Sequence, residues 1–192
     1  MLWQDPSTAA GAHSRAWAVL REPRSRTIAQ RLGIGDPASA EMCLGCHVTP
    51  GRQRGPRFQL SDGVGCESCH GPASNWLASH YAVGGTHSNN VARGMVPLEN
   101  PRARASVCLD CHFGSADEGQ FVTHRIMAAG HPRISFELDL FSTLQQHHDE
   151  DADYARRKGR TNNVRMWAVG DPRPIPTHAL RVLLLDLAET QS

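Results

Sequence analysis

All the cysteines of this chain occur in one pattern, in which two cysteines separated by two residues are followed directly by a histidine. The pattern appears as Cys43-Leu44-Gly45-Cys46-His47, Cys66-Glu67-Ser68-Cys69-His70 and Cys108-Leu109-Asp110-Cys111-His112. Two thiols at this spacing reach both vinyl groups at one edge of a porphyrin. The next residue then lies under the iron, where its imidazole becomes the proximal ligand. The pattern therefore predicts three covalently bound haem c groups, each with one iron.

Three other uses of paired cysteines are less consistent with the sequence. A zinc site could join Cys43 and Cys46 to Cys66 and Cys69, but it would leave the third pair without a partner and give the adjacent histidines no role. A disulfide framework is disfavoured because CxxC pairs are poor structural cross-links. A redox-active CxxC needs a strand and helix context that this sequence lacks.

The remaining histidines determine whether each iron has a second axial ligand. An iron with two axial ligands has no open coordination position, so electron transfer is its main chemistry. They are His13, His80, His87, His124, His131, His147, His148 and His178. We expect His13 on a helix over about 7–22, where Trp17 and Leu20 share its face. We expect His80 to end a helical stretch over 72–81 and to serve a neighbouring haem, since it is close to His70 in sequence.

His124 and His131 are further candidates for distal ligands. A helix from about Gly119 would contain His124 and end near His131, before Pro132. A spacing of seven residues leaves both histidines on the same side of the helix, and we expect both to face the interior.

The other candidates are weaker. His147 and His148 adjoin a charged run, which indicates a solvated loop, while His87 lies in a Gly/Ser/Asn loop and His178 begins the last helix. Methionine is an alternative axial ligand, but the abundance of histidine disfavours it. The methionines considered are Met42, Met95, Met127 and Met166.

Composition and patterning predict a mostly α-helical, haem-nucleated fold with little or no β structure. Aromatic residues are only 6% of the 192 residues, which is thin for an ordinary core and suits one filled partly by porphyrins. We expect a single domain over 1–192, with a haem-binding core at about 13–141. A packing helix over 134–146 is predicted next, then a charged loop and an amphipathic helix within 147–192. Residues 49–65 and the helix over 176–189 are candidate partner contacts.

Charge and hydropathy bear on partners and location. The formal net charge of +1 gives no field for binding nucleic acid, and no apolar run approaches the roughly 20 residues that span a bilayer. The arginine-rich basic set suits pairing with haem propionates, although a compositional bias gives the same excess. Haem attachment takes place outside the bacterial cytoplasmic membrane, so we expect an exported, periplasmic or extracellular protein. The sequence shows no signal peptide, which predicts a processed or recombinant form.

Several stretches resemble the multihaem cytochromes c related to hydroxylamine oxidoreductase and to the tetrahaem cytochrome of nitrifiers. They are the run from Gly63 to Ala73 with Trp76, Leu77 and His80, the run from His13 to Trp17, and the run from Ala129 to Arg133 with Phe136 and Glu137. The resemblance implies closely stacked haems, mostly with two histidine ligands, and places distal ligands at His13, His80, His124 and His131. Four candidates for three irons imply that one supports another ligand or binds a haem on another chain.

The favoured function is electron transfer with other redox proteins or cytochromes. One alternative is a redox enzyme with an open haem that acts on a small nitrogen or sulfur compound. No tyrosine or lysine in this sequence obviously marks a modified catalytic haem, and this disfavours the enzyme alternative. The other alternative is a subunit of a larger cytochrome complex or haem filament.

Overall fold

A computed structural model describes residues 10–51, 55–115 and 119–134, together with 5, 7, 8, 117, 136–138 and 141. Across these residues the fold consists of short helices, and the only extended pairing there is an isolated bridge between Ser115 and Gln120. The predicted mostly α-helical class is confirmed. In chain order the helices are η2 (Ala10–Arg15), η3 (Ala18–Arg21), α1 (Pro23–Leu32), α2 (Glu41–His47), η4 (Leu60–Asp62), α3 (Glu67–His70), η5 (Ala73–Asn75), α4 (Leu77–Tyr81), α5 (His87–Ala92), α6 (Pro101–Leu109), η6 (Asp110–Gly114) and α7 (His124–Ala128).

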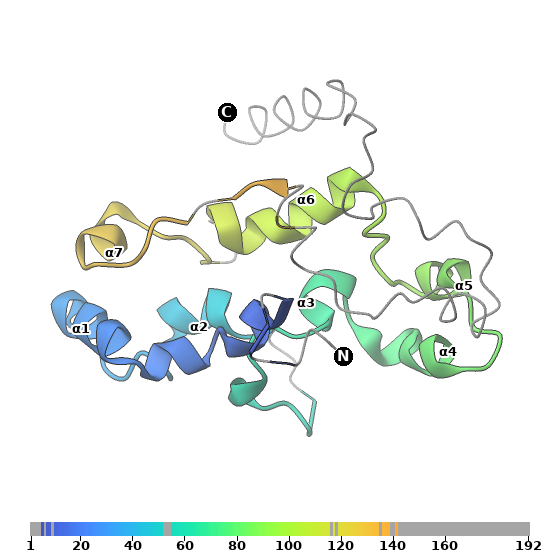
Figure 1. The fold of residues 1–192 in the computed structure, drawn as a ribbon, viewed down its shortest axis with the longest axis horizontal. Helices are drawn as coiled ribbons and strands as arrows, with labels where there is room; N and C mark the ends of the chain where they lie inside the picture. Colours follow the sequence, from blue (N-terminus) through green and yellow to red (C-terminus); the bar gives the residue numbers. More distant parts are fainter. Residues whose placement is uncertain are drawn as a thin grey trace.

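The helices form two rows in space. Helices α1 to α4 follow one another along one row, and α6 and α7 lie along the other (Figure 1). The rows are joined where α1 contacts α7 and where α3 contacts α6, while α4 packs against α5. Segments far apart in sequence are therefore brought together at both joins. None of the described helices is long and apolar enough to cross a membrane.

The N-terminal segment differs from the single helix predicted over about 7–22. It forms two short 3₁₀ helices, η2 and η3, and the regular helix α1 begins only at Pro23. The residue before a proline is driven into extended conformation, and Glu22 has φ −75° and ψ 157°. The predicted face is nevertheless present, since Leu20 is buried and Trp17 packs against the same cluster.

The apolar core consists of three small clusters. The first centres on Leu20, Ala38, Leu44 and Val48, the second on Leu32, Ile126 and Ala129, and the third on Ala73, Trp76 and Met95. Each cluster lies beside one or two of the candidate ligand segments. Small separate clusters are the arrangement expected where non-protein groups complete the interior.

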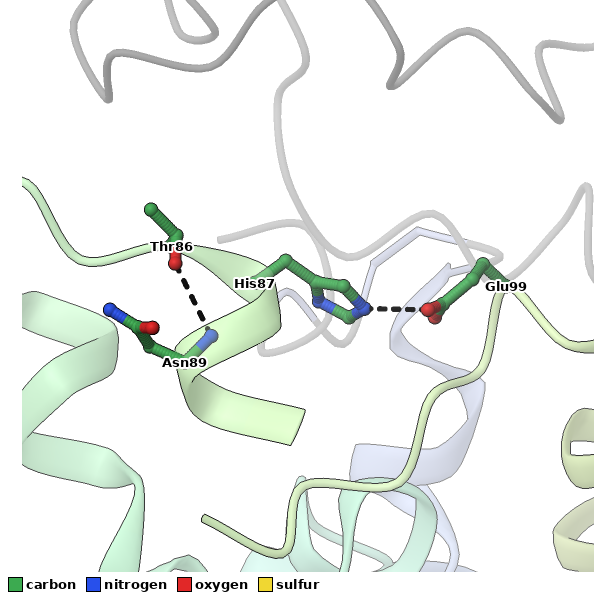
Figure 2. Close-up of polar contacts among 4 residues, drawn as sticks. All are labelled: Thr86, His87, Asn89 and Glu99. Carbon is green, nitrogen blue, oxygen red and sulfur yellow. Dashed lines mark hydrogen bonds and ion pairs between the residues drawn. The ribbon is translucent and has the colours of Figure 1, made fainter. Parts of the chain in front are cut away.

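Helices α4 and α5 form a hairpin that differs in detail from its prediction. The helical stretch predicted over 72–81 is divided into η5 and α4. His87, predicted in a loop, begins α5, where the Thr86 hydroxyl accepts from the Asn89 backbone N–H at 3.2 Å (Figure 2). The His87 Nε2 bonds a Glu99 carboxylate oxygen at 2.8 Å, which joins α5 to the segment before α6 (Figure 2).

The segment after the third CxxCH motif is also less helical than predicted. The helix expected from about Gly119 begins at His124, because Gln120 pairs with Ser115 and Thr123 caps the helix through its hydroxyl. Of the packing helix predicted over 134–146, only 134, 136–138 and 141 are among the described residues. The predicted charged loop and C-terminal amphipathic helix lie outside them.

Candidate functional site

Each CxxCH motif lies on a helical segment. The first is contained in α2, the second runs from the residue before α3 to its end, and the third passes from α6 into η6. Residues three and four apart lie on one face of a helix. Both cysteines of a motif are thus presented together with its histidine. The third motif crosses from an α-helical to a π-helical turn, a feature often found at functional sites.

The three motifs meet at their cysteines. The Cys111 thiol donates a hydrogen bond to Cys46, which lowers the pKa of Cys46 and raises that of Cys111. Burial, together with a smaller contribution from the neighbouring Cys108, raises the pKa of Cys69 to about 12. The third motif therefore adjoins both the first and the second, although the first two are nearer in sequence.

Five of the six thiols, all but Cys46, have a raised pKa, which disfavours the thiolate form used in zinc binding and disulfide exchange. Burial is the largest cause of the raised pKa of Cys43, Cys66 and Cys108. Zinc ligands and reactive CxxC pairs are thiolates, which need a lowered pKa. Within the described residues, moreover, no three His, Cys, Asp or Glu side chains converge as a metal-ion site.

His47 of the first motif is paired with His131. Their ring centroids are 6.4 Å apart with the ring planes at 81°. Two imidazoles on opposite sides of one metal have centroids roughly 6.3–6.5 Å apart, because metal–nitrogen bonds are about 2.0–2.1 Å. A T-shaped contact between rings gives a similar separation, so the ring protons must decide between the two.

The positions of the ring protons of His47 and His131 favour the binding of one metal by both histidines. His47 Nδ1 donates to the Ala16 carbonyl at 2.5 Å, and His131 Nδ1 donates to the Pro132 carbonyl at 2.8 Å. A carbonyl only accepts, so Nε2 of each neutral ring keeps its lone pair. Burial, more than any other cause, lowers the pKa of His47 and favours its neutral form. Two Nε2 atoms without protons cannot bond each other, whereas both can bind one metal.

The ring of His112 in the third motif lies beside the ring of His13. The ring centroids are 6.1 Å apart and the planes are at 89°. Phe136 and Phe141 pack against the His112 ring, with centroids 5.6 Å and 5.4 Å away. These two phenylalanines belong to the apolar stripe predicted over 134–146. Two of the four predicted distal histidines thus lie beside a motif histidine.

The second motif has a tryptophan between its histidine and His80. The Trp76 ring contacts His70 at 6.3 Å and His80 at 5.9 Å between centroids. The Trp76 indole N–H and the Ser68 hydroxyl are buried without a hydrogen-bond partner within the described part of the chain. Buried polar groups are nearly always bonded. These two donors therefore fit a site for a large group with acceptor oxygens, as a haem has in its propionates.

His124 is placed differently from the other predicted ligands. It is exposed at the first residue of α7, whereas His131 is half-buried. The prediction that both histidines point toward the interior is wrong for His124, because the helix starts at this residue and turns it outward. Among the methionines, Met95 is buried in the third cluster, Met42 and Met127 are exposed, and Met166 lies outside the described residues.

Gly63 brings the loop before the second motif against the backbone of His13. Its φ is +66°, and an added Cβ would lie 2.6 Å from the His13 carbonyl oxygen. The Val64 N–H donates to that same carbonyl at 3.0 Å. Thr49 continues the contact, since its hydroxyl accepts from the Gly65 N–H at 2.7 Å. The Gly63-Val64-Gly65 run therefore connects the second motif to the segment that presents His13.

Two further anchors were not evident from the sequence. Gln120 is buried, and its amide donates to the Gly45 carbonyl inside the first motif. Helices α1 and α7 are joined by arginines that donate to carbonyls at the other helix's C-terminal end, which we call the arginine clasp. Its bonds are Arg24 to Gly130 at 2.9 Å, Arg31 to Ala129 at 3.1 Å and Arg125 to Leu32 at 2.7 Å. The clasp holds the end of α7, directly before His131.

Comparison with known proteins gives a family signal over the first two motifs. A family model described as cytochrome c554 and c-prime matches residues 7–71. Cytochrome c-554 of Nitrosomonas europaea is 36% identical over 92 residues, which cover 43% of this chain and 36% of that protein. These matches support a multihaem c-type cytochrome.

The match covers only part of the relative, which limits what can be inferred from it about this chain. The chain spans little more than a third of the relative's length, 36%. No solved structure matches the chain. The likeness thus supports covalently bound haem and electron transfer, whereas the wider relation to hydroxylamine oxidoreductase stays a prediction.

Proposed function

We propose that this chain is an exported electron-transfer protein with three haem c groups. They would be attached at Cys43 and Cys46, at Cys66 and Cys69, and at Cys108 and Cys111. His47, His70 and His112 would be the proximal ligands. Bound haem supplies reversible one-electron chemistry. The chain's contribution is to ligate, bury and orient each group.

The pairing of motif histidines with distant histidines carries this proposal. His131 would be the distal ligand opposite His47, and His13 the distal ligand opposite His112. The centroid separations of 6.4 Å and 6.1 Å support it, as does the matched Nδ1–H tautomer of His47 and His131. Two histidine ligands leave no iron position for a substrate, which favours electron relay.

The contacts between cysteines support an order for the relay. Cys111 bonds to Cys46, and Cys108 adjoins Cys69. Groups attached at these sulfurs would meet edge to edge, so the third motif stands between the first and the second. We propose that electrons pass in the order first, third, second, or the reverse.

The first experiment is to count haems and measure their spin states. The chain is produced with an export leader and haem maturation, and the haem content is measured by the pyridine haemochrome and by mass. Three haems per chain are expected, and replacing Cys108 and Cys111 by serine should leave two. An unchanged count in that variant would contradict the proposal.

The electron paramagnetic resonance spectrum tests the ligation. Axial imidazoles that are nearly perpendicular leave two iron d orbitals close in energy and give one strongly anisotropic low-spin signal. The angles of 81° and 89° predict this signal from two irons. Carbon monoxide added to the reduced protein should leave these two irons unchanged. Binding at the first or third motif would favour the alternative, a small-molecule redox enzyme with an open haem.

Location and partners follow from the same chemistry. Haem attachment requires export, so we propose a periplasmic or extracellular location with other cytochromes as electron donors and acceptors. A place in a larger complex or filament agrees with four candidate distal histidines for three irons. Analytical ultracentrifugation of the haem-loaded chain distinguishes a monomeric carrier from such an assembly.

A further inference from the structure

The indole N–H of Trp76 is a buried donor without an acceptor. The side chain is 3% exposed and packs with Ala73 and Met95 in the third core cluster. Its Nε1 has no hydrogen-bond partner within the described residues. An indole nitrogen can only donate, and a buried one nearly always has an acceptor. An acceptor from outside the described part of the chain is therefore required.

Trp17 shows how this chain satisfies another indole. Although its side chain is only half-buried, Trp17 donates through Nε1 to the Ala38 carbonyl at 3.0 Å. Trp76 is the more deeply buried of the two, so its N–H loses more contact with water and has the greater need of a partner. The contrast between the two tryptophans makes the unbonded indole of Trp76 the exception that needs an explanation.

The position of the Trp76 ring indicates where its acceptor comes from. The ring lies against that of His70, with centroids 6.3 Å apart and planes at 67°. His70 is the proposed proximal ligand of the haem attached at Cys66 and Cys69, so the indole adjoins the site of that haem. The periphery of a haem c is hydrocarbon except for two propionate carboxylates, which accept hydrogen bonds. A bond from an N–H to such a carboxylate is charge-assisted and stronger than one between neutral groups.

We propose that the Trp76 indole N–H donates a hydrogen bond to a propionate carboxylate of the haem attached at Cys66 and Cys69. Trp76 is then a positioning residue that orients the second haem against α3 and α4. The proposal rests on the proposed function, because it needs a haem at the second motif. It differs from aromatic packing on His70, which requires the ring of Trp76 but not its nitrogen.

Resonance Raman spectroscopy of the haem-loaded full chain tests this bond, because the bending frequencies of haem propionates respond to hydrogen bonding. Trp76→Phe keeps an aromatic ring and removes the N–H, so it should shift one propionate mode. Trp76→Gln keeps N–H donors and removes the ring, so its propionate mode should stay closer to that of the parent protein. The reverse order would overturn the proposal, since aromatic packing alone predicts it.

Two controls assign the effect. Trp17→Phe removes an indole that is bonded to the Ala38 carbonyl, so it should leave every propionate mode unchanged. In a chain with Cys66 and Cys69 replaced by serine, the mode that depends on Trp76 should be absent, and adding Trp76→Phe should change no remaining mode. A change there would place the acceptor on another haem and refute the proposal.

Deuterium exchange tests the bond without any substitution, in case a Trp76 variant does not fold. After full exchange in heavy water the indole N–H of the parent protein becomes N–D. At least one propionate mode is expected to move. If no propionate mode moves, no N–H donates to any propionate and the proposal is wrong.

The haem count distinguishes failure of this proposal from failure of the proposed function. If three haems are attached and no propionate mode depends on Trp76, the relay stands and the role of Trp76 is wrong. If the second motif of the parent protein carries no haem, the proposed function fails first.

Discussion

The His47–His131 pair and the His80–Asn90 contact position imidazole rings in opposite ways. In the first, histidines from distant parts of the chain each donate Nδ1–H to a backbone carbonyl. In the second, the ring is held by a side chain ten residues away on the adjacent helix. Backbone partners survive substitution of their residue, whereas a side-chain partner is lost with one change. The first arrangement is therefore resistant to mutation and the second is adjustable.

Replacing His131 should have the largest effect, since it removes a proposed iron ligand rather than a residue that supports one. In His131→Ala the first motif's iron is expected to become high-spin and to bind carbon monoxide, adding one binding site per chain. His124→Ala is the matched control, because His124 is exposed. If the two variants bind equal amounts of carbon monoxide, the pairing with His47 is wrong.

Gly63 tests how closely the backbone arrangement is packed. Gly63→Ala meets both an unfavourable positive φ and a contact of 2.6 Å with the His13 carbonyl. It should lower the free energy of unfolding by about 3 kcal/mol, of which about 1 kcal/mol belongs to φ. Gly84→Ala shares the positive φ of +78° with no atom within 4 Å, so it should show only the smaller loss. Equal losses in denaturant unfolding would mean that the loop relaxes away from His13.

Gln120 tests the side-chain anchor of the first motif. Gln120→Ala removes a buried donor to the Gly45 carbonyl and should lower the free energy of unfolding by about 1–2 kcal/mol. The exposed Gln30 on α1 offers the control Gln30→Ala, for which no comparable loss is expected. The anchoring role is rejected if urea midpoints of both variants match the parent protein.

The smallest effect is expected at the His87–Glu99 contact. Its side chains are 41% and 43% exposed, and exposed pairs contribute little. Glu99→Gln should therefore change the free energy of unfolding by about 0.5 kcal/mol or less. A much larger loss would show that the position of α5 depends on this contact.

The chemistry of the cysteines could be predicted from sequence because it depends on local spacing alone. Helical character and Trp17–Leu20 burial were equally readable, since both follow from periodicity over a few residues. Pro23 could be recognised in the sequence as a residue that interrupts a helix. The sequence did not show that the turns before it are 3₁₀ and those after it α-helical. The backbone of η2 also lies against Gly63, a contact with a residue far along the chain that local sequence does not reveal.

The pairing of ligands could not be predicted, because it depends on tertiary contacts. His124 and His131 are equivalent candidates by spacing, and only the start of α7 at His124 separates them. Asn90 gave no signal, since asparagine in a Gly/Ser/Asn stretch is typical of a loop. Its burial becomes visible only when α5 packs on α4.

The arginine clasp has a consequence for how this chain can change over evolutionary time. Its acceptors are the carbonyls of Leu32, Ala129 and Gly130, which every residue type supplies. Positively charged donors also complement the C-terminal ends of helices. Substitutions of the residues that carry these carbonyls are therefore compatible with the clasp as long as the three arginines remain. Selection should preserve Arg24, Arg31 and Arg125 more strictly than the other exposed residues of α7.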